Sequence, residues 1–131
     1  MQALPLRLSP GDDLRETLTA ALARHGVQAA FVVQGIGSLS AVELRYAGVD
    51  TPASLRGDFE ILTLAGSLSR DGAHLHASVS DAHGRVSGGH VAHGCIVRTT
   101  AEVLLMLLPD YAFTREHDAQ TGFMELVVRK A

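Results

Sequence analysis

Apolar and polar residues alternate along much of the chain, which is the pattern of β-strands that bury one face. Glycine, proline, aspartate and serine gather between the alternating stretches, where turns are expected. Residues 35–40 are interpreted as a turn or a bulge, and residues 47–55 as a surface loop. The pattern predicts strands over residues 3–8, 27–35, 41–46, 57–68, 74–81, 94–108, 113–116 and 123–128, with a glycine-rich hairpin after the fifth of these.

One helix is predicted directly after the first strand. Asp12 or Asp13 can cap its start, and His25-Gly26 marks its end. Its apolar positions follow helical spacing and are Leu14, Leu18, Ala21 and Leu22. One main helix with roughly seven to nine strands joined by hairpin-like turns predicts an α+β fold with a strongly curved, barrel-like antiparallel sheet.

Length and composition favour a single domain that spans residues 1–131. A chain of 131 residues is too short for two ordinary domains. Hydrophobic residues make up 47% and charged residues 19%, which is a globular balance. Because aromatic residues make up only 5%, we expect a mainly aliphatic core.

The charge of the chain does not favour nucleic acid as a partner. The formal net charge is −3, Lys130 is the only lysine, and the arginines are scattered. The single Cys95 cannot form an intramolecular disulfide, and we expect a small buried residue there. No secretory signal is visible, and the longest apolar run, residues 103–108, is too short to cross a bilayer. A soluble, cytoplasmic protein without a membrane partner is therefore expected.

The most informative stretch is the predicted strand over residues 74–81. Alternation places His74 and His76 on its polar face, close enough for both imidazoles to reach one ion. The glycine-rich turn that follows can bring His90 back beside them. Three neutral imidazoles suit a divalent metal, zinc above all, while iron, nickel, copper or manganese also accept such ligands. The alternative is that these histidines are simply solvated on a half-exposed strand.

Two acids and one arginine are candidates for catalysis beside such a metal. Glu60 lies between Phe59 and Ile61, so it is interpreted either as a partly buried carboxylate with a partner or as an exposed acid. Glu60 or Glu102 could transfer protons, and Arg98 could hold a substrate carboxylate through its planar fork.

Several segments, taken in this order, resemble the plants-and-prokaryotes conserved (PPC) domain family in its bacterial and archaeal form. The resemblance covers nearly the whole chain. The segments that carry it are Gly57–Leu62, His74–Asp81, Gly88–His90, Arg98–Val103, Phe113–Glu116, Thr121–Phe123 and Glu125–Leu126.

The family resemblance implies a homotrimer of α+β subunits and a DNA-binding or regulatory role. In plants the domain follows AT-hook motifs, whereas this chain has no Arg-Gly-Arg-Pro hook. The chain is also similar in fold to acetolactate decarboxylase, a zinc enzyme whose metal is held by a His-x-His pair and a later histidine. This second resemblance implies that His74, His76 and His90 are the metal ligands, with Glu60 as a further candidate ligand.

Three functions therefore stand open. The first is a DNA-binding or regulatory trimer, in which arginines such as Arg45 or Arg98 contact phosphates. The second is a metal-dependent enzyme, a lyase or a hydrolase, acting on a small polar metabolite. The third is a sensor that binds a metal or small ligand without turning it over.

Overall fold

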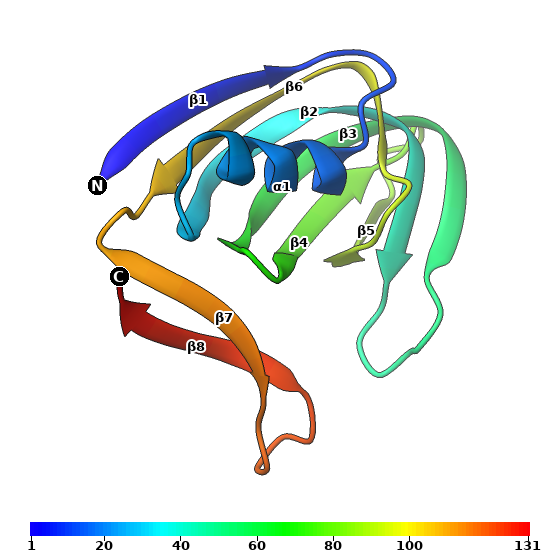
Figure 1. The fold of residues 1–131 in the computed structure, drawn as a ribbon. Coiled ribbons are helices and arrows are strands. Elements are labelled where there is room, and N and C mark those ends of the chain that lie inside the picture. The colour runs from blue at the N-terminus through cyan, green and yellow to red at the C-terminus, as the bar shows by residue number, and fades with distance from the viewer.

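Eight β-strands and one α-helix make up the fold in a computed structural model, which describes residues 1–131 (Figure 1). The elements are β1 (Gln2–Leu8), α1 (Leu14–Arg24), β2 (Ala29–Arg45), β3 (Ala53–Ser69), β4 (Gly72–Ser80), β5 (Val86–Val91), β6 (Ile96–Leu107), β7 (Tyr111–His117) and β8 (Met124–Lys130). The predicted α+β class with one main helix is confirmed.

Six strands form one antiparallel sheet in the order β1-β6-β2-β3-β4-β5. The sheet curls until β5 also pairs with the end of β2, where Leu44 lies opposite Val91 and Arg45 lies opposite His90. Helix α1 lies across the curled sheet (Figure 1). The strong curvature expected from the sequence is therefore confirmed, and it brings the ends of β2, β4 and β5 together.

Helix α1 forms where capping and spacing predict it. Asp13 is the N-cap, and its carboxylate accepts hydrogen bonds from the backbone N–H of Glu16 at 3.0 Å and of Gly94 at 2.7 Å. The chain leaves the helix through His25 and then Gly26, whose φ of 64° is left-handed. All four predicted apolar positions of the helix are buried.

The core lies between α1 and the sheet and contains 25 buried residues, nearly all aliphatic. On β4 the buried and more exposed residues alternate, so that Leu75, Ala77 and Val79 face the core. The residues between them, including His74 and His76, point to the opposite face. The packing of the core therefore fixes which face of β4 carries the histidines.

Residues 35–40 are not a turn. They lie inside β2, a continuous strand of 17 residues, and the register of β2 shifts against β3 or β6 between Leu39 and Ala41 and at neighbouring points. The prediction of a bulge is therefore confirmed and that of a turn is wrong. The glycines of this segment bend the strand around the core without ending it, because an extra residue on one strand increases its local twist.

Strands β7 and β8 form a separate two-stranded hairpin that projects from the main sheet (Figure 1). Phe113 is buried at its base, with its ring 5.6 Å from that of Phe31 in an edge-to-face arrangement. The backbone N–H of Arg115 donates to Asp71 at 2.9 Å. The hairpin therefore lies against the turn that leads into β4.

The helix of this fold is too short and too polar to cross a membrane.

Candidate metal centre

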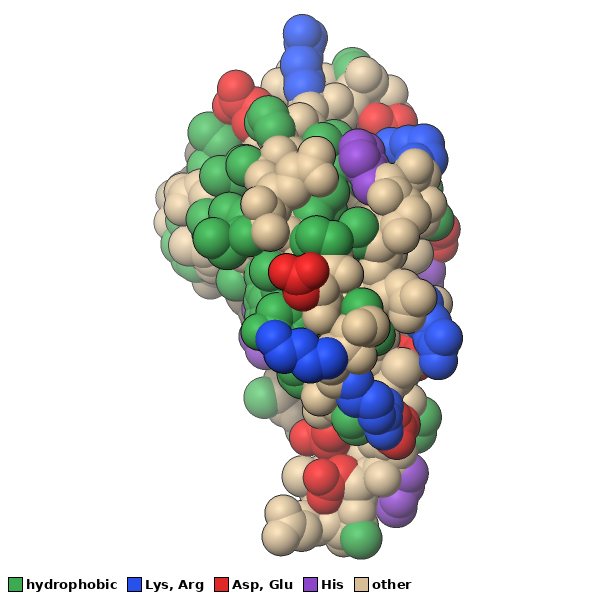
Figure 2. Space-filling model, turned by 60° about the vertical axis from the view of Figure 1, so that its left-hand side comes forward, with side chains coloured by type: hydrophobic (Ala, Val, Ile, Leu, Met, Phe, Trp, Pro, Cys, Tyr) green, Lys and Arg blue, Asp and Glu red, His purple; other side chains and the backbone are tan.

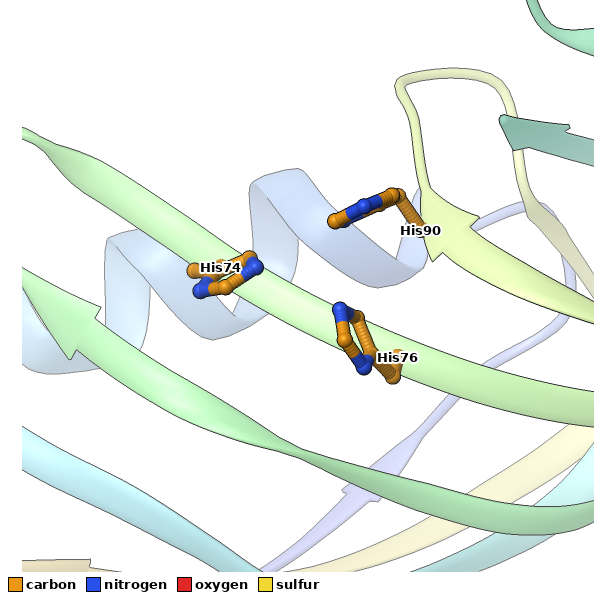
Figure 3. A group of neighbouring side chains, drawn as sticks. All are labelled: His74, His76 and His90. Carbon is orange, nitrogen blue, oxygen red and sulfur yellow. The ribbon is translucent and has the colours of Figure 1, made fainter. Parts of the chain in front are cut away.

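Three histidines converge on the face of β4 and β5 that points away from the core. His76 lies opposite His90 in the antiparallel pair, and His74 precedes His76 by two residues on the same face. His74 and His76 are exposed and His90 is half-buried. Figure 3 shows the three rings turned toward one another, with His90 at the end of β5.

The spacing of the rings is close to that of a metal site. The ring centroids are 5.0 Å apart for His74 and His76, 5.4 Å for His74 and His90, and 4.5 Å for His76 and His90. One nitrogen from each ring can be chosen so that all three lie within 4.8 Å of one another. Two nitrogens bound to one zinc ion are at most about 4.2 Å apart, since each bond is about 2.1 Å long. Small rotations about the soft ring torsions close this gap.

The surroundings of His74 and His90 lower the pKa of both imidazoles and so favour their neutral forms. Burial, followed by the charge of Arg115, lowers the pKa of His74 from 6.5 to about 4. Burial, followed by the charge of Arg45, also lowers the pKa of His90. A neutral imidazole keeps a free lone pair, which is the form that binds a metal. Near neutral pH, His74 is therefore in its metal-binding form.

Two glycines allow the strands to approach closely at this site. A Cβ on Gly66 of β3 would lie 2.1 Å from the carbonyl oxygen of His74, and the φ of Gly66 is +154°. A Cβ on Gly89 of β5 would lie 2.7 Å from the carbonyl oxygen of Arg45 on β2. Because neither glycine has a side chain, β3 and β5 can pack against their neighbours where the histidines stand.

Two cavities adjoin the histidines. The larger, of about 1130 Å³, is lined by His74 and His90 together with Arg15, Arg45 and Arg115. The smaller, of about 510 Å³, is lined by His74 and His76 and reaches the β7–β8 hairpin at Arg115 and Glu125. The hairpin therefore brings both a cation and an acid to the histidine cluster.

The structure places Glu60, Arg98 and Glu102 elsewhere, and none of them lines either cavity. Glu60 is exposed, opposite Ser38 and Ser80 in the sheet, which agrees with the second of its two interpretations, an exposed acid, and not with the partly buried one. The reason is that it falls on the outward face of β3. Arg98 forms an ion pair with Asp58 at 3.0 Å, and Glu102 is exposed on β6. Their catalytic roles stay predictions.

Sequence reasoning assigned to this site none of the six charged residues that line the cavities, and it considered Arg45 only as a contact to phosphates. The six are Arg15, Arg45, Asp50, Asp71, Arg115 and Glu125. Arg45 faces the site because it pairs with His90, a contact between two strands that are far apart in the sequence. Arg115 and Glu125 arrive on a hairpin whose packing no local pattern reveals. For Arg45, the pairing of β2 with β5 was the signal that could have found it, whereas Arg15 lies on α1 and pairs with no strand.

Cys95, His25 and His93 also carry reactive groups, but each lies outside the histidine cluster and makes contacts typical of a structural residue. Cys95 is buried, and burial raises the pKa of its thiol to about 11, so it is a poor nucleophile. The Nδ1 atom of His25 lies 2.9 Å from the carbonyl oxygen of Ala21 at the end of α1. His93 lies outside the cluster, with its Nδ1 atom 2.6 Å from the carboxylate of Glu16.

Comparison with known proteins gives both a family and close structural relatives. Residues 1–109 match the Plants and Prokaryotes Conserved (PCC) domain. The chain is 43% identical over 129 residues to the Bifunctional protein GlmU of Synechococcus sp. (strain JA-2-3B'a(2-13)), a match that covers 98% of the chain and 20% of that protein. The chain thus spans about a fifth of the length of the curated relatives it matches.

Three solved structures have the same fold. A hypothetical protein from Salmonella enterica is 40% identical with a TM-score of 0.95, over 98% of this chain and 94% of that one. A metal-containing protein from Archaeoglobus fulgidus is 27% identical with a TM-score of 0.82, over 97% and 94%. A protein from Bacteroides thetaiotaomicron, named as a candidate DNA-binding protein, is 19% identical with a TM-score of 0.85, over 95% and 91%.

Proposed function

The chain belongs to the Plants and Prokaryotes Conserved domain family. From that premise we propose that it binds a divalent metal through His74, His76 and His90. We also propose that it is a homotrimer. The observation that carries the metal proposal is the convergence of one nitrogen from each ring to within 4.8 Å of the others. The structure of a metal-containing protein from Archaeoglobus fulgidus, 27% identical, supports the presence of a metal in a protein of this fold.

The donor set favours zinc. Three imidazoles leave a coordination position open, as in catalytic zinc sites, and iron, nickel or manganese are the alternatives for such ligands. The low pKa of His74 supports metal binding at neutral pH, because no proton has to be displaced from that ring. The three histidines would hold the metal, and the chemistry it would supply is polarisation of a carbonyl group or a lower pKa for a bound water.

The proposed activity is that of a lyase or hydrolase on a small polar metabolite, with a sensor as the alternative use of the same site. Glu125 is the acid best placed to exchange a proton there, since it lines the smaller cavity together with His74 and His76. Roles for Glu60, Glu102 and Arg98 require a site shared between subunits, because within one chain they lie outside both cavities.

Exposed apolar side chains on β2 and β3 support the homotrimer. Phe31, Val33, Ile36 and Leu62 all lie on the surface of these two neighbouring strands. Large apolar side chains gathered on one part of a surface are typical of contacts between proteins. A ring of three subunits could cover them by repeating one contact around a three-fold axis.

Cobalt substitution tests the metal centre directly. We expect metal-free protein to take up one Co(II) ion per chain and to show the strong visible bands of a four- or five-coordinate ion. His76→Ala should lose these bands, because it removes the ring that neighbours both others. The matched control is His83→Ala, an exposed histidine outside the cluster. Bands that persist in His76→Ala would refute the site.

DNA binding with a regulatory role is the second candidate, favoured by the name of the Bacteroides thetaiotaomicron protein of the same fold. The surface seen in Figure 2 offers no continuous basic area, since Lys and Arg side chains stand apart among acidic and neutral ones. DNA would therefore have to meet arginine patches repeated by the trimer. If phosphates are bound, log affinity must fall linearly with log salt concentration. Binding that is absent, or independent of salt, excludes this role.

A further inference from the structure

Three arginines from three different elements surround the larger cavity beside the histidines. Arg15 comes from α1, Arg45 from the end of β2, and Arg115 from β7. His74 and His90 line the same cavity. The three arginines therefore line one open cavity together with two of the proposed metal ligands.

Each arginine is held next to a histidine by the backbone or by a hydrogen bond. Arg115 Nη2 donates to Ser67 Oγ at 2.9 Å, and Ser67 lies opposite His74 in the β3–β4 pair. Arg15 Nη1 donates to the carbonyl oxygen of Val91 at 3.2 Å, one residue after His90.

The third arginine is fixed by strand pairing. Arg45 lies opposite His90 in the β2–β5 pair, and its Nη1 donates to the carbonyl oxygen of Val49 at 3.4 Å. All three positions are thus set by the fold and not by a carboxylate.

No carboxylate neutralises these three cations. The ion pairs of the structure join Arg56 to Glu43, Arg98 to Asp58, Arg129 to Glu116 and His93 to Glu16. Three acids also line the cavity, but none lies within ion-pair distance of its arginines. They are Asp50, Asp71 and Glu125.

One of these acids is already engaged by the backbone of the hairpin. Asp71 uses its Oδ2 atom to accept the backbone N–H of Arg115. The three guanidinium groups are therefore not engaged by any carboxylate, which leaves them available to an anionic ligand.

Resting on the metal centre proposed above, we propose that this cavity binds a small metabolite through a carboxylate or phosphate group held by Arg15, Arg45 and Arg115. The planar fork of a guanidinium matches both oxyanions, and arginine keeps its charge throughout the physiological range. A cavity of about 1130 Å³ is ample for a small metabolite that also reaches the metal. The arginines would then orient the ligand, and its other end would lie at the histidines.

Calorimetric titration tests this assignment with two probes, succinate for carboxylates and glycerol 3-phosphate for phosphates. Both are titrated into the full chain, metal-loaded and metal-free, and into Arg45→Gln and Arg115→Gln. Losing one charged hydrogen-bonding partner should weaken binding about tenfold or more. The matched control is Arg85→Gln, an exposed arginine in the β4–β5 turn outside the cavity, which should change nothing. The probe that binds identifies the anionic group.

Metal content and far-UV circular dichroism of every variant separate this inference from the metal proposal. Failure of both probes to bind a parent protein that carries its metal would overturn the anion site and leave the metal centre intact. Equal weakening by Arg85→Gln would also overturn it, since the attraction would then be nonspecific. Probe binding that depends on Arg45 and Arg115 in a protein that takes up no metal would support the anion site and refute the metal centre.

Discussion

Gly66→Ala is expected to damage both the fold and the histidine cluster, because β3 touches β4 at this residue. The new Cβ would lie 2.1 Å from the carbonyl oxygen of His74 and 2.9 Å from the Cα of Leu75. Non-bonded heavy atoms normally lie about 3.5 Å apart, so β4 must move away by roughly 1 Å or more. That movement weakens the β3–β4 pairing where Gly66 lies opposite Leu75 and displaces His74.

The cost of this substitution follows from two contributions. A backbone with φ of +154° costs an alanine about 1–2 kcal/mol. Weakening one or two backbone hydrogen bonds of the ladder adds about 1 kcal/mol each. We therefore expect the free energy of unfolding to fall by about 2–4 kcal/mol.

Gly84→Ala is the matched control for backbone strain alone. Gly84, in the β4–β5 turn, has a φ of +77°, and no atom would lie within 4 Å of an added Cβ. It should cost only about 1–2 kcal/mol. Urea unfolding followed by circular dichroism measures both variants. If Gly66→Ala is no less stable than Gly84→Ala and still binds metal like the parent, the close approach of the strands does not position the histidines.

Three further predictions follow from the same structure. Leu75→Ala, which empties a core position that is 1% exposed, should lower the free energy of unfolding by about 2–5 kcal/mol in urea titrations. The pKa of His74 is about 4 in the folded chain and 6.5 as its ordinary value, so the unfolded chain takes up this proton at a higher pH than the folded chain does. The free energy of unfolding of the metal-free protein should therefore decrease as the pH falls from 6.5 to 4. In His74→Asn this decrease should be smaller, because the titrating ring is absent. If the proposed trimer forms, Ile36→Asp, on the exposed apolar part of β2, should convert it into monomers in sedimentation equilibrium, whereas Val86→Asp, on β5, should leave it intact.

The histidine cluster could be inferred from the sequence because its determinants are local. Alternation along 74–81 decides which face of the strand carries His74 and His76, and the glycines before His90 indicate a hairpin return. The structure brings the three together with His76 opposite His90. The helix was predictable for the same reason, since Asp13 and the apolar spacing of α1 lie within one short stretch.

The surroundings of the cluster could not be inferred because they depend on pairings between distant segments. Arg45 reaches His90 only because the sheet curls until β2 meets β5. Arg115 arrives on a hairpin that is not part of the main sheet. Glu60 shows how alternation settles a question that the sequence left open: Phe59 and Ile61 are buried, so Glu60 between them lies on the outward face of β3, as the exposed alternative has it. The sequence did not show that β2 continues through residues 35–40, because glycines are found in β-bulges as well as in turns.

The most direct test of the account is metal content per chain, measured by plasma emission spectrometry on protein purified without a histidine tag. The account predicts close to one divalent metal per chain in the parent, and loss of that metal in each of His74→Ala, His76→Ala and His90→Ala. His83→Ala and His93→Ala, which change histidines outside the cluster, should keep it. A parent that stays metal-free even after incubation with zinc, iron or nickel, or a cluster variant that retains full occupancy, would contradict the central claim.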